Sequence, residues 1–122
     1  MLTGILNLIA TKFYLYWSNR YFDIPMHFLG GLWVTLTVLW IWSQRKGFTL
    51  PEKLNVMKVG ILSAIIVGIL WETYELYFGI TFLSDGVRYW SDTVSDLIMD
   101  YVGAVFGSLY AFGLLQKQNN EQ

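Results

Sequence analysis

Carboxylates and the single histidine of this sequence gather at or inside its apolar segments, where ionisable side chains are rare. Three aspartates, Asp92, Asp96 and Asp100, follow one another at intervals of four residues, so a helix places them on one face. Glu72 and Glu75 form a second pair on another apolar segment. An ionised carboxylate at the centre of a membrane helix costs about 2.5–3.5 kcal/mol. Such groups are therefore expected to face a wet cavity, share protons or bind a cation.

Carboxylates combined with one imidazole suit a hard or borderline divalent cation, namely magnesium, manganese, calcium or zinc. We therefore predict a metal site whose ligands come from two facing helices: Asp92, Asp96, Asp100 and Glu72. Glu75 or His27 would act as a general base beside it. Arg88 would bind an anionic head group.

Two of these acids also have a structural interpretation. Asp92 is suited to cap the start of the third apolar segment, and capping does not exclude metal ligation. Asp23, directly before Ile24 and Pro25, is interpreted as a turn or cap residue rather than a ligand.

The composition is that of an integral membrane protein. Of 122 residues, 55% are hydrophobic and only 14% are charged, and the mean hydropathy is +0.45. The net charge of −1 gives no basis for nucleic-acid binding. Because there is no cysteine, disulfides, thiol catalysis and thiolate metal sites are excluded. The expected fold class is all-α, an integral membrane bundle of three to four transmembrane helices in a single domain, 1–122.

Three apolar runs, 26–43, 56–80 and 94–115, are long enough to span a bilayer. The segment 1–18 is either an amphipathic interfacial helix or a first span, and it lacks the basic region and cleavage site of a signal peptide. The tail 116–122 is expected to fray. Arg45, Lys46 and Lys53 make 44–55 the most basic loop, so the positive-inside rule places this loop and the C-terminus in the cytoplasm of a multi-pass cell-membrane protein. His27 and the carboxylates then share the outer half of the membrane.

Small residues form stripes on the second and third spans. Gly60, Ala64 and Gly68 share a face with Glu72, and Gly103 and Gly107 share one with Asp100. Small-xxx-small faces let membrane helices approach closely. We expect these two faces to pack together, with His27 and Gly31 of the first span closing an acidic pocket. The same faces offer a route to a homo-oligomer.

The stretches "DIPMHFLGG", "WETYE" and "WSDTVSDLIMDYVGAVFG" resemble the YjdF-like family of small integral membrane proteins, and more loosely the VanZ-like group. The resemblance covers roughly residues 20–110. It is carried by Asp23, His27, Gly30, Trp71, Glu72, Glu75, Asp92, Thr93, Asp96 and Gly103. It implies a multi-span membrane protein and brings little biochemistry with it.

Three functions fit these features, all with membrane lipid as the immediate partner. The first is a metal-dependent enzyme acting on a lipid or lipid-linked phosphate, because the acidic pocket lies at the depth of head groups. The second is a proton or cation transporter or channel subunit, since intramembrane carboxylates are common in ion paths. The third is a non-catalytic membrane subunit or sensor that uses the cation for folding.

Overall fold

The computed structural model describes residue 12 and residues 22–45 and 52–121. Within them the chain forms three long helices, α3 (Asp23–Ser43), α4 (Lys53–Tyr77) and α5 (Val87–Asn120), and a short 3-10 turn, η1 (Leu83–Asp85). All three helices are long and apolar enough to cross a membrane. The expected all-α membrane bundle is confirmed. The expectation for 1–18, interfacial helix or first span, lies outside the described residues apart from Lys12.

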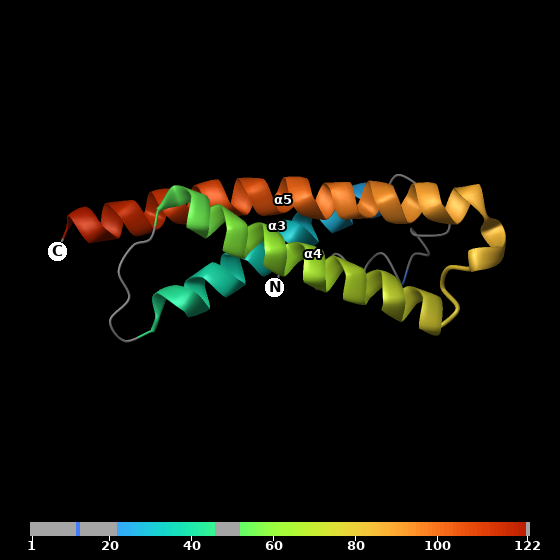
Figure 1. Ribbon diagram of the computed structural model, residues 1–122. Helices are drawn as coiled ribbons and strands as arrows, with labels where there is room; N and C mark the ends of the chain where they lie inside the picture. Colours follow the sequence, from blue (N-terminus) through green and yellow to red (C-terminus); the bar gives the residue numbers. More distant parts are fainter. Residues whose placement is uncertain (1–11, 13–21, 46–51, 122) are drawn as a thin grey trace.

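The helices form an elongated bundle in which every pair is in contact. Figure 1 shows that α3 and α5 run in the same direction and that α4 runs opposite to both. The start of α3, the end of α4 and the start of α5 therefore lie at one end of the bundle, which we call the His27 end. Most of the acidic residues discussed above lie near this end.

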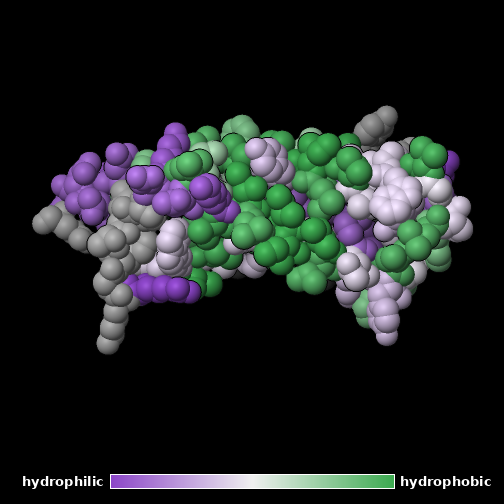
Figure 2. Space-filling model, viewed as in Figure 1, coloured by the Kyte–Doolittle hydropathy of each residue, from purple (hydrophilic) through white to green (hydrophobic). Residues whose placement is uncertain are grey.

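The surface has the banded pattern of a membrane protein. Figure 2 shows a broad hydrophobic band across the middle of the bundle, strongly hydrophilic residues where α5 ends, and a mixed surface at the His27 end. Many exposed side chains of the three helices are large and apolar, among them Leu62, Ile66, Leu70, Ile98 and Phe106. In water this exposed area would be costly, whereas lipid tails solvate it at little cost.

Glycines end α4 and precede α5. Gly79 takes φ +68, and the amides of Gly79 and Ile80 donate to the carbonyls of Leu76 and Glu75, which satisfies two orphan acceptors at the end of the helix. Gly86 takes φ +59, and α5 begins at the next residue, Val87.

These helix ends differ from several of the expected boundaries. Because α5 begins at Val87, Asp92 lies in its second turn and does not cap the helix. At its other end α5 continues to Asn120, so the segment expected to fray from 116 is helical almost to its end. The first helix, Asp23–Ser43, starts three residues before the expected span 26–43 and ends with it, whereas the second, Lys53–Tyr77, is shifted by three residues from the expected 56–80.

The interior is layered along the bundle axis. Charged and polar side chains, His27, Glu72, Asp96 and Asp100, are buried near the His27 end. Two turns further along their helices come the buried hydroxyls of Thr35 and Ser108, and Thr35 Oγ1 donates to the carbonyl of Gly60 at 3.1 Å. Beyond them Leu39, Val56 and Ala111 form an apolar core. The interior is thus polar at one end and closed by hydrocarbon at the other.

The small-residue faces pack differently from the expected pairing. A Cβ on Gly103 would meet the carbonyl oxygen of Phe28, and one on Gly107 would lie 3.1 Å from the carbonyl oxygen of Leu32, so the α5 glycines face α3 rather than α4. The α4 glycines do face α5, because a Cβ on Gly60 or Gly68 would collide with Ser108 Oγ or Asp100 Oδ2. The correction has a simple cause. Glycine stripes indicate where backbones approach, but a single stripe does not indicate which of two neighbours approaches it.

Candidate functional site

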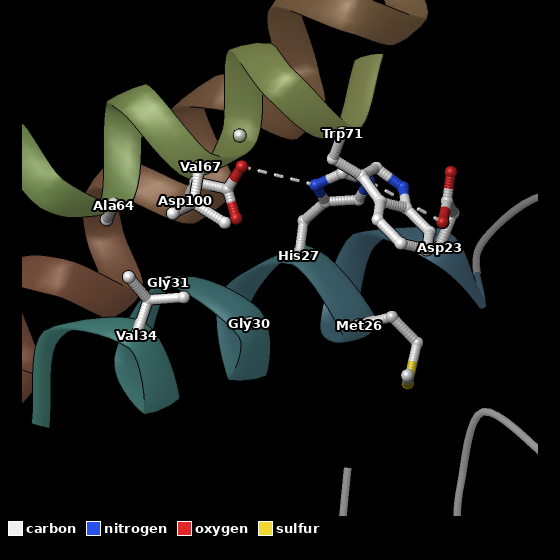
Figure 3. Close-up of a pocket in the computed structure, with 11 residues that line it drawn as sticks. Asp23, Met26, His27, Gly30, Gly31, Val34, Ala64, Val67, Trp71 and Asp100 are labelled. Carbon is white, nitrogen blue, oxygen red and sulfur yellow. Dashed lines mark hydrogen bonds and ion pairs between the residues drawn. The ribbon is translucent and has the colours of Figure 1, made fainter. Parts of the chain in front are cut away.

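The centre of the candidate site is His27, which lies in the second turn of α3 and directs its ring to α5. It is 7% exposed. Its Nδ1 lies 3.3 Å from Asp100 Oδ2 on α5. On the other side of the ring, Nε2 lies 3.7 Å from Asp23 Oδ1 and 4.0 Å from Asp96 Oδ2. Figure 3 shows the ring lying between Asp100 and Asp23. We call these four residues, Asp23, His27, Asp96 and Asp100, the His27 cluster.

Asp23 is the member that sequence reasoning missed. The sequence favours a turn or cap role for it, but it makes no capping hydrogen bond within the described residues, and it lies in the first turn of α3 with its carboxylate toward His27. The available signal was its spacing. Asp23 and His27 are four residues apart, so any helix covering both places them on one face.

Asp96 and Asp100, both predicted as metal ligands, are buried and face His27. Asp100 is held closely by glycines of the other two helices. A Cβ on Gly68 would collide with its carboxylate, and a Cβ on Gly31 would collide with its backbone carbonyl. The two glycines therefore let α5 come close enough for Asp100 to reach the imidazole.

Glu72 lies beside the cluster on α4 and is 7% exposed. Its Oε2 accepts a hydrogen bond of 2.7 Å from Thr93 Oγ1 on α5. Its Oε1 is buried and has no hydrogen-bond partner among the described residues. The carboxylate is close enough to His27 and Asp23 to interact with both electrostatically. A buried oxygen with no partner is uncommon in folded proteins and calls for an explanation, such as a bound ion or water.

The Glu72–Thr93 bond leads to a first prediction. Thr93→Val keeps the shape of the side chain and removes the hydroxyl, so we expect it to lower the free energy of unfolding by about 1–2 kcal/mol, because the acceptor is a buried carboxylate. Thr73→Val is the matched control, since the Thr73 hydroxyl is exposed and donates only to the carbonyl of Ile69 within α4. Thermal or denaturant unfolding in detergent measures both. Equal effects of the two substitutions would contradict the assignment.

Among the described residues, the remaining predicted site residues form no hydrogen bond or ion pair with the cluster. Glu75 is half-buried and accepts a hydrogen bond of 2.9 Å from Trp71 Nε1. Asp92 is half-buried and interacts electrostatically with Asp23 and Glu72, but it does not belong to the group of residues close enough to share one ion. Arg88 is exposed in the first turn of α5, and no ion pair is formed by it within the described residues.

A groove opens between α3 and α4 beside the cluster. Its volume is about 240 Å³. Asp23, His27 and Asp100 line one part of it, and the rest is small or apolar: Met26, Gly30, Gly31, Val34, Ala64, Val67, Gly68 and Trp71. Figure 3 shows Met26 and Val34 contributed by α3, and Ala64, Val67 and Trp71 contributed by α4. The cluster is thus reached through an apolar passage between two membrane helices.

One atom each of Asp23, His27 and Asp96 lie within 4.8 Å of one another, a spacing from which all three can approach one metal ion. Two ligands of a tetrahedral zinc ion at about 2.1 Å from the metal lie roughly 3.4 Å apart. Nε2 lies 3.7 and 4.0 Å from the two carboxylate oxygens, which is somewhat wider than this spacing. This geometry is compatible with two states: a divalent cation bound between these atoms, or a protonated His27 paired with the aspartates.

No curated protein and no solved structure matches the chain. The model of one protein family, DUF2238, described as a predicted membrane protein, matches residues 3–117. This match agrees with the YjdF-like resemblance, because that family is the same one. The looser resemblance to the VanZ-like group is not supported. The match covers α3, α4, all but the last three residues of α5 and the whole His27 cluster. The chain therefore belongs to the DUF2238 family of predicted membrane proteins.

Proposed function

We propose that the protein binds a divalent cation at the His27 cluster and uses it to act on a lipid or lipid-linked phosphate. The observation that carries the proposal is the placement of the two ring nitrogens of His27. In the tautomer with its proton on Nδ1, His27 donates to Asp100 and presents the Nε2 lone pair toward Asp23 and Asp96. A metal-ligating histidine in proteins almost always donates its other ring N–H to a carboxylate or a carbonyl.

The proposed roles differ from those expected from sequence. Asp23, His27 and Asp96 are the ligands, and Asp100 orients the imidazole instead of binding the ion.

The general base is Glu72 rather than Glu75 or His27, because Thr93 fixes one of its oxygens and leaves the other without a partner. A bound cation would polarise a phosphoryl oxygen or lower the pKa of a water molecule. It would also compensate several buried carboxylates that face one imidazole.

A phosphate substrate is favoured by where the cluster lies. It is near one end of three helices that are long and apolar enough to span a membrane, so a bilayer around them would bring lipid head groups close to it, and the apolar groove leads to it from the side. The basic loop at 44–55 favours the outer leaflet as the side on which this end lies. Arg88, exposed near the same end in the first turn of α5, is available to an anionic head group.

Transport is less well supported. The buried hydroxyls of Thr35 and Ser108 extend the polar interior beyond the cluster, but the apolar core of Leu39, Val56 and Ala111 follows them. A proton or cation would have to pass this core. The observed interior favours a site that is entered and left from one side.

Metal content tests the proposal. The detergent-purified protein, prepared without chelator and then offered manganese or zinc, is expected to hold about one ion per chain by elemental mass spectrometry. Asp96→Asn should abolish this binding with the fold intact. Asp85→Asn is the matched control, because Asp85 is exposed in η1 and outside the cluster.

Turnover is the second step of the same test. The wild type with metal is expected to release phosphate from a lipid phosphate in mixed micelles, and Glu72→Gln should lose this activity while it keeps the ion. An absence of metal under every loading condition would sink the proposal. Metal binding without turnover would support the non-catalytic alternative instead.

A further inference from the structure

We infer that the groove between α3 and α4 binds one hydrocarbon chain of a phosphate-bearing membrane lipid, with the head group at the His27 cluster. The inference deepens the proposed function and rests on it for the cation that would hold the head group. The binding of the hydrocarbon chain depends only on the groove.

The first argument is direction. From His27 to Val34 on α3, and from Trp71 to Ala64 on α4, the groove walls extend seven residues, or about 10 Å, away from the His27 end. Half of a hydrocarbon core is about 15 Å thick. The groove therefore runs parallel to the lipid chains of the leaflet at this end, with its polar part at head-group depth.

The second argument is Gly30, which lines the groove. Gly31 and Gly68 also line it, but an added Cβ there would collide with Asp100, so helix packing explains both glycines. A Cβ on Gly30 would lie 3.7 Å from Asp100 Oδ1, which is ordinary contact. Packing within the described residues thus does not require glycine at 30, although glycine is unfavourable inside a helix. The missing side chain leaves room in the groove for something else.

The third argument is access and polarity. Val67 and Trp71, on the α4 wall, are 42% and 44% exposed, so the passage opens on the outer side of the helices, where a bilayer would place lipid. At its polar part, Asp100 directs Oδ2 to His27 and has Oδ1 near Gly30. An occupant needs an apolar body and a polar end that interacts with a cation, and a phosphate-bearing lipid has both.

The test uses the full chain in detergent with manganese, titrated with dioleoyl phosphatidic acid and followed by native mass spectrometry. Gly30→Leu fills the groove and is expected to weaken lipid binding about tenfold or more, since displacing two methylene groups from an apolar site changes affinity by that order. Val67→Phe adds bulk from the opposite wall and should act in the same way. Gly113→Leu is the matched control, because Gly113 lies on the exposed side of α5 with nothing within 4 Å of an added Cβ.

Metal content measured in the same samples separates this inference from the proposed function. If the protein holds no manganese but lipid binding still depends on Gly30, the groove assignment stands and the proposed cation site is wrong. In the opposite case all three variants retain manganese, and Gly30→Leu and Val67→Phe bind lipid as well as Gly113→Leu does. That result leaves the proposed function standing and overturns the groove inference. A shift of oligomeric state in Gly30→Leu without loss of lipid also overturns it, since the groove would then hold a second copy of the chain.

Discussion

Gly103→Ala is expected to lower the free energy of unfolding by about 1–3 kcal/mol, although it adds a single methyl group. That methyl group would meet the backbone carbonyl oxygen of Phe28 and lie 2.8 Å from the backbone nitrogen of Leu32. Neither atom belongs to a flexible side chain, so the two helices must separate. Because Phe28 is next to His27, the same separation should pull the imidazole away from Asp96 and Asp100 and weaken any metal binding.

The glycines of α5 supply a graded control for this prediction. A Cβ on Gly107 would lie 3.1 Å from the carbonyl oxygen of Leu32, which a small adjustment relieves, and one on Gly113 would contact nothing within 4 Å. The loss of stability should therefore fall from Gly103→Ala to Gly107→Ala. Gly113→Ala should be neutral or slightly stabilising, because alanine favours helix over glycine. Unfolding in detergent measures all three, and an effect at Gly113 as large as that at Gly103 would falsify the packing of α5 on α3.

Much of the fold was predictable from sequence because lipid imposes simple requirements. A bilayer requires about 20 apolar residues per helix and satisfied backbone groups, so the presence of three spans follows from hydropathy alone. The ends of the helices were harder to predict. Polar residues at the head-group boundary are compatible with both loop and helix, and α5 extends through Asp92 at one end and Gln116 at the other.

The site was predictable in composition but not in arrangement. Periodicity places Asp96 and Asp100 on one face of α5, and both reach His27. Which carboxylates meet depends on how each helix is rotated against two neighbours, and the pattern of one helix does not contain that information. Asp92, one turn before Asp96, is therefore left half-buried, while Asp23 on another helix takes its place beside the imidazole.

His27→Gln is expected to lower the free energy of unfolding by about 3 kcal/mol or more, because it removes the basic partner of three aspartates of which two are buried. Glutamine keeps polarity and approximate size but carries neither the charge nor the metal-binding nitrogen. Lys117→Gln is the comparison, since the Lys117–Glu121 pair at 4.0 Å is exposed and its loss should cost less than about 0.5 kcal/mol. Adding Asp100→Asn to His27→Gln should recover part of the stability, and strictly additive effects of the two substitutions would contradict the His27–Asp100 contact.

The same variant distinguishes the two states that the cluster geometry allows. If His27 is a metal ligand, a chelator should lower the melting temperature of the wild type and leave that of His27→Gln unchanged, because a ligand that binds only the folded state stabilises it. If the imidazole is instead a protonated counter-ion, the chelator should change neither protein, while His27→Gln remains destabilised. Both cases predict a large mutational effect, so the response to the chelator decides between them. The first result would make Asp100 the orienting partner of a metal ligand, and the second would make it one half of a buried ion pair.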